Sequence, residues 1–212
     1  MSGTTRQPRL VDLFCKAGGA TKGYQRAGFH VTGVDKDPQP NYCGDEFVQA
    51  DALTFPLAGF DAAHASPPCQ RWMGVPFARG DEYPDLLGPT RELLQRSGLP
   101  CVIENIATAP VNGPVLCGLT FGLPVIRHRR FETSPEIVLW PSSLCPQTSW
   151  GRGTAHRGCY PFAHGAWRPA WRKYVMPVLW PWMTLEETHD AIPPAYTEWI
   201  GLQLSAELKV AA

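Results

Sequence analysis

The sequence lacks any uninterrupted apolar stretch as long as a membrane span, and its first residues do not resemble a secretion signal. We therefore expect a cytoplasmic protein with no membrane partner. Its seven cysteines are odd in number and irregularly spaced, which favours reduced thiols over a disulfide framework. An excess of one charge is also missing, because 19 Lys and Arg balance 19 Asp and Glu. This balance argues against binding nucleic acid through bulk charge.

What is present predicts one folded domain. Of the 212 residues, 44% are hydrophobic and only 18% are charged, which is enough apolar surface for a core and argues against disorder. The charge is unevenly distributed, since residues 126–175 carry a local excess of six positive charges. Their basic residues are Arg127, Arg129, Arg130, Arg152, Arg157, Arg168, Arg172 and Lys173. A polyanion could be attracted to this part of the chain alone.

Short apolar segments alternate with helical ones through the first half of the chain. This alternation predicts a parallel α/β sheet with right-handed crossovers. Strands are expected at residues 9–14, 29–35, 47–51, 59–64 and 100–106. Helices are expected after the first glycine-rich turn up to about residue 27, and at residues 85–97, 184–191 and 195–210. Thr184 as N-cap and Glu187 three residues later form a capping-box pattern at the start of the third helix.

Three of the expected strand ends carry groups suited to a nucleoside. A glycine-rich turn over residues 15–23 follows the first strand and opens a helix, so the backbone can approach a ligand closely. Asp35 ends the second strand and Asp51 the third, where a carboxylate can accept hydrogen bonds from ribose hydroxyls. Each signal alone fits an ordinary tight connection, but together they favour a nucleoside pocket.

The fourth strand leads into Ala65-Ser66-Pro67-Pro68-Cys69-Gln70. Two prolines end the strand, so Cys69 lies on a rigid loop at the carboxyl end of the sheet, where open α/β folds bind ligands. The alternative is that Cys69 is an inert buried thiol. The fifth strand ends in Glu104-Asn105, and a carboxylate within an apolar run is costly unless it is paired or used.

The second half of the chain is harder to interpret. Alternation over residues 127–132 would direct Arg127 and Arg129 to one face, unless the segment is only a solvated edge strand. Six of the eight tryptophans follow among prolines and arginines, at positions 140, 150, 167, 171, 180 and 182. They suit base stacking or a small irregular core equally well. Cys145, His156, Cys159 and His164 do not match a standard zinc finger, and we predict no metal.

Four motifs occur in an order that resembles the DNA (cytosine-5)-methyltransferases. They are Asp12-Leu13-Phe14 with Gly18-Gly19, then Ser66-Pro67-Pro68-Cys69-Gln70, then Glu104-Asn105, and Gly122-Leu123-Pro124 before Arg127-His128-Arg129. The resemblance covers residues 9–132 well and the end of the chain poorly. It implies a Rossmann-like, S-adenosylmethionine-dependent α/β methyltransferase fold, with cytosine in DNA flipped out of the helix and methylated at C5.

The resemblance also implies a role for each site residue. It makes Cys69 the nucleophile, Glu104 the acid that contacts the base, and Arg127 and Arg129 the basic pair. Burial would raise the pKa of Glu104, and a nearby arginine would favour the Cys69 thiolate. The cofactor residues that it implies are Phe14, Gly18, Gly19, Asp35, Asp51 and Pro68, and the substrate residues are Ser66, Gln70 and Asn105.

The chain departs from the family pattern in three places. Val125 replaces a glutamine, and Pro193-Pro194-Ala195 lies where the family has a Gly-Asn motif. The segment available for target recognition, residues 133–181, is short. We expect a catalytic unit of residues 1–132 and 182–212 with a reduced recognition insert, and relaxed sequence specificity. A free pyrimidine nucleotide or RNA as substrate, or an inactive nucleic-acid-binding module, remains an alternative.

Overall fold

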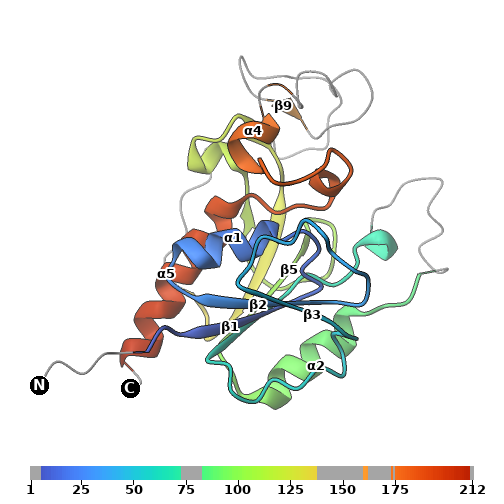
Figure 1. Cartoon of the computed structure of the whole chain (residues 1–212). Helices are drawn as coiled ribbons and strands as arrows, with labels where there is room; N and C mark the ends of the chain where they lie inside the picture. Colours follow the sequence, from blue (N-terminus) through green and yellow to red (C-terminus); the bar gives the residue numbers. More distant parts are fainter. Residues whose placement is uncertain (1–5, 73–82, 138–159, 162–172, 174, 211–212) are drawn as a thin grey trace, which may run out of the picture.

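A computed structural model shows the architecture of the chain and describes residues 6–72, 83–137, 160–161, 173 and 175–210. Its centre is a seven-stranded sheet built around β1 (Figure 1). From one edge to the other, the strands are β3 (Glu46–Gln49), β2 (His30–Asp35), β1 (Arg9–Leu13), β4 (Ala62–Ala65), β5 (Cys101–Ile106), β8 (Arg129–Ser134) and β6 (Val115–Leu116). The first five are parallel, which confirms the expected Rossmann-like α/β fold. β8 runs antiparallel to both of its neighbours, which the sequence pattern did not predict.

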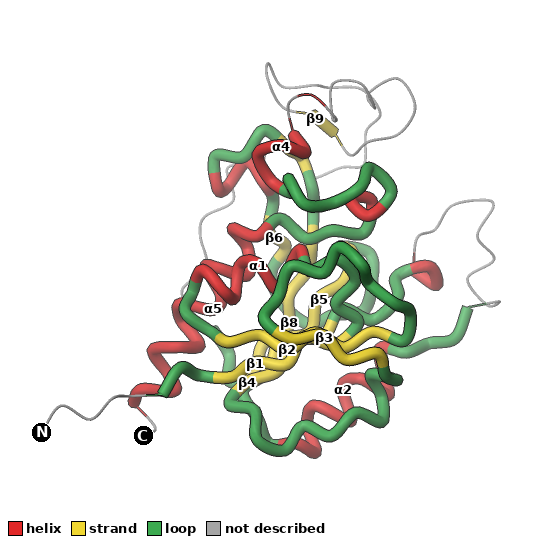
Figure 2. The backbone as a smooth tube through the Cα atoms, viewed as in Figure 1, coloured by secondary structure: helices red, strands yellow, loops and turns green. Residues whose placement is uncertain are grey.

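Helices cover both faces of the sheet (Figures 1 and 2). α1 (Gly19–Arg26) and α5 (Pro194–Val210) pack against each other on one face, and α2 (Leu87–Ser97) lies on the other. All three helices were predicted, α2 and α5 within two residues of both bounds and α1 within one residue of its end. No helix among the described residues combines the length and the apolar character that crossing a membrane would require.

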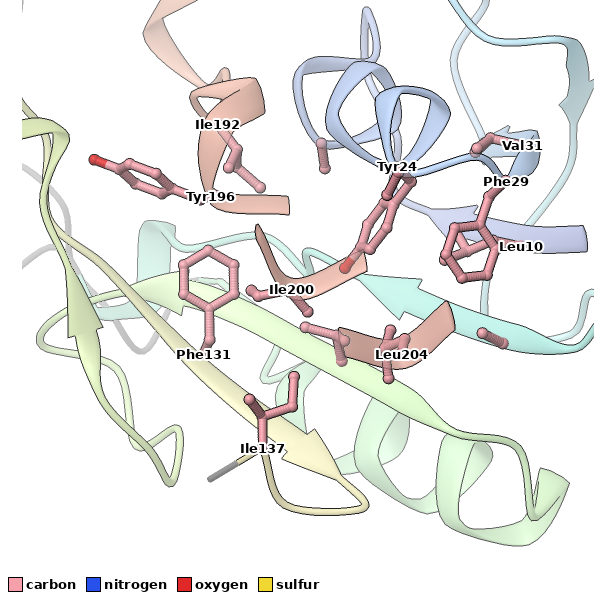
Figure 3. Packing of buried hydrophobic residues seen from close by; sticks show 14 of the residues in the cluster. Leu10, Tyr24, Phe29, Val31, Phe131, Ile137, Ile192, Tyr196, Ile200 and Leu204 are labelled. Carbon is pink, nitrogen blue, oxygen red and sulfur yellow. The ribbon is translucent and has the colours of Figure 1, made fainter. Parts of the chain in front are cut away.

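The alternation of side chains along β1 assigns its residues to two cores. Leu10 packs with Tyr24 of α1 and Ile200 of α5 in the cluster shown in Figure 3. Val11, the next residue, belongs to the opposite cluster together with Leu94 of α2. Successive strand residues point to opposite faces, so this one strand connects both apolar layers and fixes its own register.

Gly23 permits the close contact of α1 with α5. A Cβ at this position would overlap with the Thr197 side chain and the Pro194 carbonyl oxygen. We therefore expect Gly23→Ala to lower the free energy of unfolding by about 3 kcal/mol, measured by urea denaturation. Arg26→Ala on the same helix is the control, because it removes only an exposed ion pair with Glu198 and costs under about 0.5 kcal/mol. An equal effect of the two substitutions would contradict this account of the packing.

The predicted helix over residues 184–191 is wrong, although its capping box is present. Glu187 Oε2 accepts a hydrogen bond from the Thr184 N–H at 2.6 Å, and Thr184 Oγ1 accepts one from the Glu187 N–H at 3.3 Å. The segment forms only the 3₁₀ turn η6 (Glu187–His189). Pro193 and Pro194 follow closely and cannot donate the backbone hydrogen bonds that would extend the helix.

The expectation for the basic segment is also corrected. β8 begins at Arg129, so Arg127 precedes the strand, and the predicted alternation does not apply to it. The edge-strand alternative is wrong as well, because β8 lies between β5 and β6. Arg130 donates hydrogen bonds to the Ala107 and Gly113 carbonyl oxygens and thus stabilises the surrounding loops.

The remaining described elements are short. They are η1 (Gln70–Trp72), η3 (Gly118–Phe121), β7 (Val125–Ile126), which pairs with β9 (Tyr160–Pro161), and α4 (Met176–Leu179). η3 ends at Gly122, whose φ is 66°.

Most of the predicted recognition insert, including the candidate zinc residues Cys145, His156, Cys159 and His164, lies outside the described residues. The described residues contain no group of three or more His, Cys, Asp or Glu arranged to hold a metal ion. Trp180 and Trp182 are described, and both are core residues that donate indole hydrogen bonds to the carbonyl oxygens of Ile192 and Ala17. Trp140, Trp150, Trp167 and Trp171 are not described.

Candidate active site

A cavity of about 320 Å³ opens where the parallel strands end. The carboxyl ends of β1, β2, β4 and β5 share one edge of the sheet, so residues distant in sequence meet there. Eleven of the thirteen predicted site residues line this cavity, and Gly18 and Arg127 do not. Those that line it are Phe14, Gly19, Asp35, Asp51, Ser66, Pro68, Cys69, Gln70, Glu104, Asn105 and Arg129.

The glycine-rich turn after β1 has an unusual backbone. Phe14 and Lys16 have φ values of 60° and 47°, and Gly18 has a φ of 87°. Positive φ in residues other than glycine is sparsely populated and tends to occur at functional sites. Asp35 holds the turn, because its Oδ2 accepts a hydrogen bond from the Lys16 N–H at 3.1 Å. Gly18 therefore shapes the turn from outside the cavity.

Asp35 and Asp51 offer carboxylate oxygens to the cavity. Asp35 is buried at the end of β2 and accepts a second hydrogen bond, from the Asp37 N–H, at 3.1 Å. Asp51 is exposed, and its Oδ1 accepts the Leu53 N–H at 2.9 Å. A carboxylate can accept about four hydrogen bonds, so each side chain keeps lone pairs for a ligand.

The loop that carries Cys69 is held from both sides. The Asn105 side-chain amide donates to the Pro67 carbonyl oxygen at 2.8 Å, and the Trp72 N–H donates to the Cys69 carbonyl oxygen at 2.9 Å. Burial raises the pKa of the half-buried Cys69 thiol, and the Arg129 guanidinium opposes this rise. The expected influence of an arginine is therefore present, but burial is the larger effect and the neutral thiol is the resting form.

Glu104 lies in the wall of the same cavity and is 4% exposed. Burial raises the pKa of its carboxyl group, and Arg129 and Arg127 oppose the rise. Arg129 Nε lies 2.9 Å from Glu104 Oε1, yet that oxygen accepts no hydrogen bond with good geometry from the described residues. The two groups thus form an ion pair in which Oε1 retains its hydrogen-bonding capacity.

Arg127 acts from behind the cavity wall. It is 3% exposed, and its guanidinium donates to the His189 carbonyl oxygen at 2.7 Å. The Tyr196 hydroxyl donates to the Arg127 carbonyl oxygen at 2.6 Å. α5 thereby fixes the backbone just before Arg129, and Arg127 contributes positive charge near Glu104.

Sequence reasoning missed the residues that close the cavity on the α5 side. Met183, Glu187, Asp190, Ala191 and Ile192 line it although they lie in the segment without the expected Gly-Asn motif. Thr197, at the start of α5, donates to the Ala20 carbonyl oxygen at 2.8 Å and ties this segment to the glycine-rich turn. No motif marks these residues, and only the packing of α5 on α1 brings them to the site.

Asp12 is a further residue that the predictions did not place in the site. It is 1% exposed and lines the cavity, and its Oδ2 accepts the Thr21 hydroxyl at 2.5 Å. Oδ1 has no partner among the described residues. Burial raises the pKa of Asp12 from 3.8 to about 7. The signal was available, because Asp12, like Glu104, is an acid within an apolar run.

The raised pKa of Asp12 predicts a pH-dependent stability. The pKa of Asp12 is 3.8 in the unfolded chain and about 7 in the folded protein, so between these pH values only the folded state keeps the proton. The free energy by which proton binding favours the folded state is therefore lost as the pH rises from 3.8 to about 7. We expect Asp12→Asn to raise the free energy of unfolding at pH 8 by about 1–3 kcal/mol and to leave it unchanged near pH 3. Urea denaturation at both pH values checks this, and an equal difference at both would contradict it.

Comparisons with known proteins find similarity at the level of structure only. No family model matches the sequence, and no curated protein matches it. One similar structure, from an E. coli prophage, is described as a DNA modification methyltransferase: identity 20%, 58% of this chain and 45% of that chain covered, TM-score 0.47. Another is the Dnmt2 methyltransferase of S. pombe: identity 18%, 59% and 48% covered, TM-score 0.44.

A third similar structure is an RNA methyltransferase from Salinibacter ruber in complex with S-adenosyl-L-homocysteine. Identity is 15%, 64% of this chain and 87% of that chain are covered, and the TM-score is 0.39. The matched region spans about half the length of the first two proteins. We therefore derive the chemistry from the side chains of this chain.

Proposed function

We propose that this chain is an S-adenosylmethionine-dependent methyltransferase that methylates cytosine at C5 in DNA, with Cys69 as the nucleophile. The proposal rests chiefly on one observation. Cys69, Glu104 and Arg129 line the same cavity as Asp35, so groups that can add to a pyrimidine ring adjoin groups that can hold a nucleoside. The motif resemblance supports the same roles for these residues.

The residues at the β1 and β2 ends fit S-adenosylmethionine. Asp35 and Asp51 can accept hydrogen bonds from ribose hydroxyls, and the half-buried Phe14 ring offers an apolar surface for adenine. The N-terminus of α1 reaches the cavity at Gly19 and Ala20, where backbone N–H groups and the helix dipole favour the carboxylate of the amino-acid portion. When bound, this cofactor supplies an electrophilic methyl group.

Asp35→Asn tests the cofactor assignment. Asparagine keeps the shape of the side chain but removes its charge and one acceptor oxygen, which weakens the bonds to ribose hydroxyls and to the Lys16 N–H. We expect about 10- to 100-fold weaker binding of S-adenosylhomocysteine by isothermal titration calorimetry. Asp37→Asn is the matched control and should keep wild-type affinity, because Asp37 is exposed and does not line the cavity. Equal affinity of the three proteins would remove Asp35 from the cofactor site.

Cytosine C5 is a weak nucleophile, and the remaining residues can activate it. The Cys69 thiol gives its proton to water, the sulfur forms a bond to C6, and the electron pair released from the C5–C6 double bond makes C5 nucleophilic. Addition increases electron density at N3, where a proton held by Glu104 stabilises the adduct. After C5 has taken the methyl group that a bound cofactor would supply, the C5 proton is lost to water, and elimination of the sulfur from C6 restores the aromatic ring. The sulfur then takes up a proton again as a thiol.

The choice of DNA follows from the motif resemblance, and the enclosed position of these groups sets a requirement on how DNA would bind. A base inside a duplex cannot reach a cavity of this kind, so it must be flipped out, at a cost of a few kcal/mol. We propose that residues 133–181 act as a reduced recognition insert and that specificity is relaxed. Arg127, Arg129 and Arg130 are engaged within the protein, so the remaining arginines of residues 126–175 are the ones that can offset part of the flipping cost by attracting phosphates. They are Arg152, Arg157, Arg168 and Arg172.

The function is tested by incubating the protein with methyl-labelled S-adenosylmethionine and, separately, duplex DNA, RNA or dCMP. We expect label in 5-methylcytosine from duplex DNA, and similar rates on duplexes of different sequence at low salt. Label in RNA or dCMP alone would replace the substrate class while keeping the reaction. Bound cofactor without transfer to any of the three would contradict the enzymatic proposal and favour a binding module.

A further inference from the structure

A chain of polar side chains runs from the core to the Glu104 carboxyl. The Tyr24 hydroxyl lies 2.9 Å from His64 Nδ1, and His64 Nε2 lies 2.8 Å from Ser66 Oγ. Ser66 directly follows Ala65, which pairs with Ile103 on the neighbouring parallel strand, so Ser66 lies beside Glu104, and both residues line the cavity. In Figure 3, the Tyr24 hydroxyl points away from α1 toward the sheet. The two hydrogen bonds thus form a path that leads from α1 through β4 to a serine next to the Glu104 carboxyl.

The direction of donation along this path follows from burial. Tyr24 and His64 are both completely buried, and burial lowers the pKa of His64 to about 3, so its imidazole is neutral. A neutral imidazole has one donor and one acceptor nitrogen. Among the described residues, His64 is the only hydrogen-bond partner of the Tyr24 hydroxyl. If the hydroxyl accepted from Nδ1, its own buried proton would have no partner, so the hydroxyl donates to Nδ1.

Donation then continues in one direction. Tyr24 donates to Nδ1, so the imidazole proton lies on Nε2 and is donated to Ser66 Oγ. The Ser66 oxygen is occupied as an acceptor, which leaves its own proton free to point at the Glu104 carboxyl. A buried polar group without a hydrogen-bond partner costs free energy, so the partners on both sides of His64 hold it in the tautomer with the proton on Nε2.

We propose that Tyr24, His64 and Ser66 are positioning residues that orient the Glu104 carboxyl and decide which of its oxygens can carry the proton. This inference rests on the proposed function, in which Glu104 holds a proton toward the pyrimidine ring. The Glu104 oxygen that accepts a hydrogen bond from Ser66 is disfavoured as the site of the carboxyl proton, because its lone pair is already engaged. The proton is therefore directed to the other oxygen, and Ser66 acts through Glu104 rather than on the substrate.

Several other charged or titratable groups act on Glu104 and set the background for the path. They are Arg129, Arg127, Asp190, Asp12 and Cys69. Ser66 opposes the effect of burial, because its donated hydrogen bond lowers the pKa of Glu104. Substitutions in Tyr24, His64 or Ser66 that leave the charged groups in place should therefore raise the pKa of Glu104.

Infrared spectroscopy can follow this titration without substrate, and Glu104→Gln identifies the band of the protonated carboxyl. We expect Ser66→Ala to raise the midpoint of that band by about one to two pH units. His64→Leu and Tyr24→Phe should shift it in the same direction by less, because each leaves the Ser66 hydroxyl in place but undirected. His64→Gln should restore the wild-type midpoint, since its amide can accept from Tyr24 and donate to Ser66.

A purely structural path would lower the thermal midpoint of these variants but leave the carboxyl titration unchanged, and that result would overturn the proposal. If His64→Leu does not fold, the titration midpoints of Ser66→Ala and His64→Gln still test the proposal, because only the first is expected to shift. If the wild-type protein transfers no methyl group but Ser66→Ala still shifts the titration midpoint of Glu104, the proposed function alone is refuted. A Ser66→Ala midpoint equal to that of the active wild type would refute the path alone.

Discussion

Cys69→Ala is expected to reduce methyl transfer to DNA by about 10³-fold or more. Without sulfur, no covalent bond to C6 can form, and C5 remains a weak nucleophile. The substitution removes one half-buried side-chain atom from a loop that Asn105 and Trp72 hold through backbone atoms. Cofactor binding should therefore persist, and turnover measured with labelled S-adenosylmethionine should be lost while calorimetry still detects S-adenosylhomocysteine.

Cys101→Ala is the matched control for this experiment. Cys101 is a buried thiol in β5 that does not line the cavity, so its loss should cost stability and leave turnover intact. Duplex DNA that contains 5-fluorocytosine gives a second readout, because fluorine cannot leave C5 as a proton does. Wild-type protein and Cys101→Ala should form a stable covalent complex that Cys69→Ala cannot form. Turnover by Cys69→Ala within tenfold of wild type would contradict the covalent mechanism.

Glu104→Gln is expected to lower the turnover number by about 10²- to 10⁴-fold, the range found for removal of a general acid. Glutamine retains the shape of the side chain but has no ionisable proton to stabilise N3. It also leaves the partly buried Arg129 guanidinium without its carboxylate, which lies 2.9 Å away in the ion pair. Steady-state kinetics with duplex DNA would measure the loss, with the Michaelis constant separating catalysis from binding.

The pH profile distinguishes a proton donor from a structural carboxylate. Burial raises the pKa of Glu104, so the protonated form persists to higher pH than in an ordinary glutamate. Wild-type turnover should fall as the pH rises through that pKa, and Glu104→Gln should lack this limb. Glu132→Gln is the control, because Glu132 of β8 pairs with Arg91 of α2 and does not line the cavity. The same alkaline limb in Glu104→Gln would exclude Glu104 as the acid.

Part of the fold was predictable because the relevant signals are local. The five parallel strands follow from short apolar runs, and the capping box at Thr184 follows from two residues three positions apart. The antiparallel direction of β8 was not predictable. It depends on pairing with β5 from Ile106–Arg129 to Cys101–Ser134, which no periodicity within residues 127–134 records.

Some residues of the candidate site could likewise be predicted from the sequence, and others could not. Motif residues such as Asp35, Cys69 and Glu104 were found because parallel strands end at one edge, so strand order alone brings them together. Arg127 was predicted at the site, but it lies behind the wall, since the strand begins only at Arg129. Asp190 had no signal at all, because the packing of α5 on α1 determines where its segment lies.

By itself, the sequence determined the parallel half of the sheet and pointed to the thiol and the carboxyl that line the cavity at the strand ends. These depend on apolar period, proline and glycine, which act over a few residues. Only the tertiary structure decided the hydrogen-bonded path from Tyr24 through His64 to Ser66, the raised pKa of Asp12 and the closure of the cavity by the residues before α5. Burial and hydrogen-bond direction arise from contacts between distant segments, and those contacts exist only once the chain has folded.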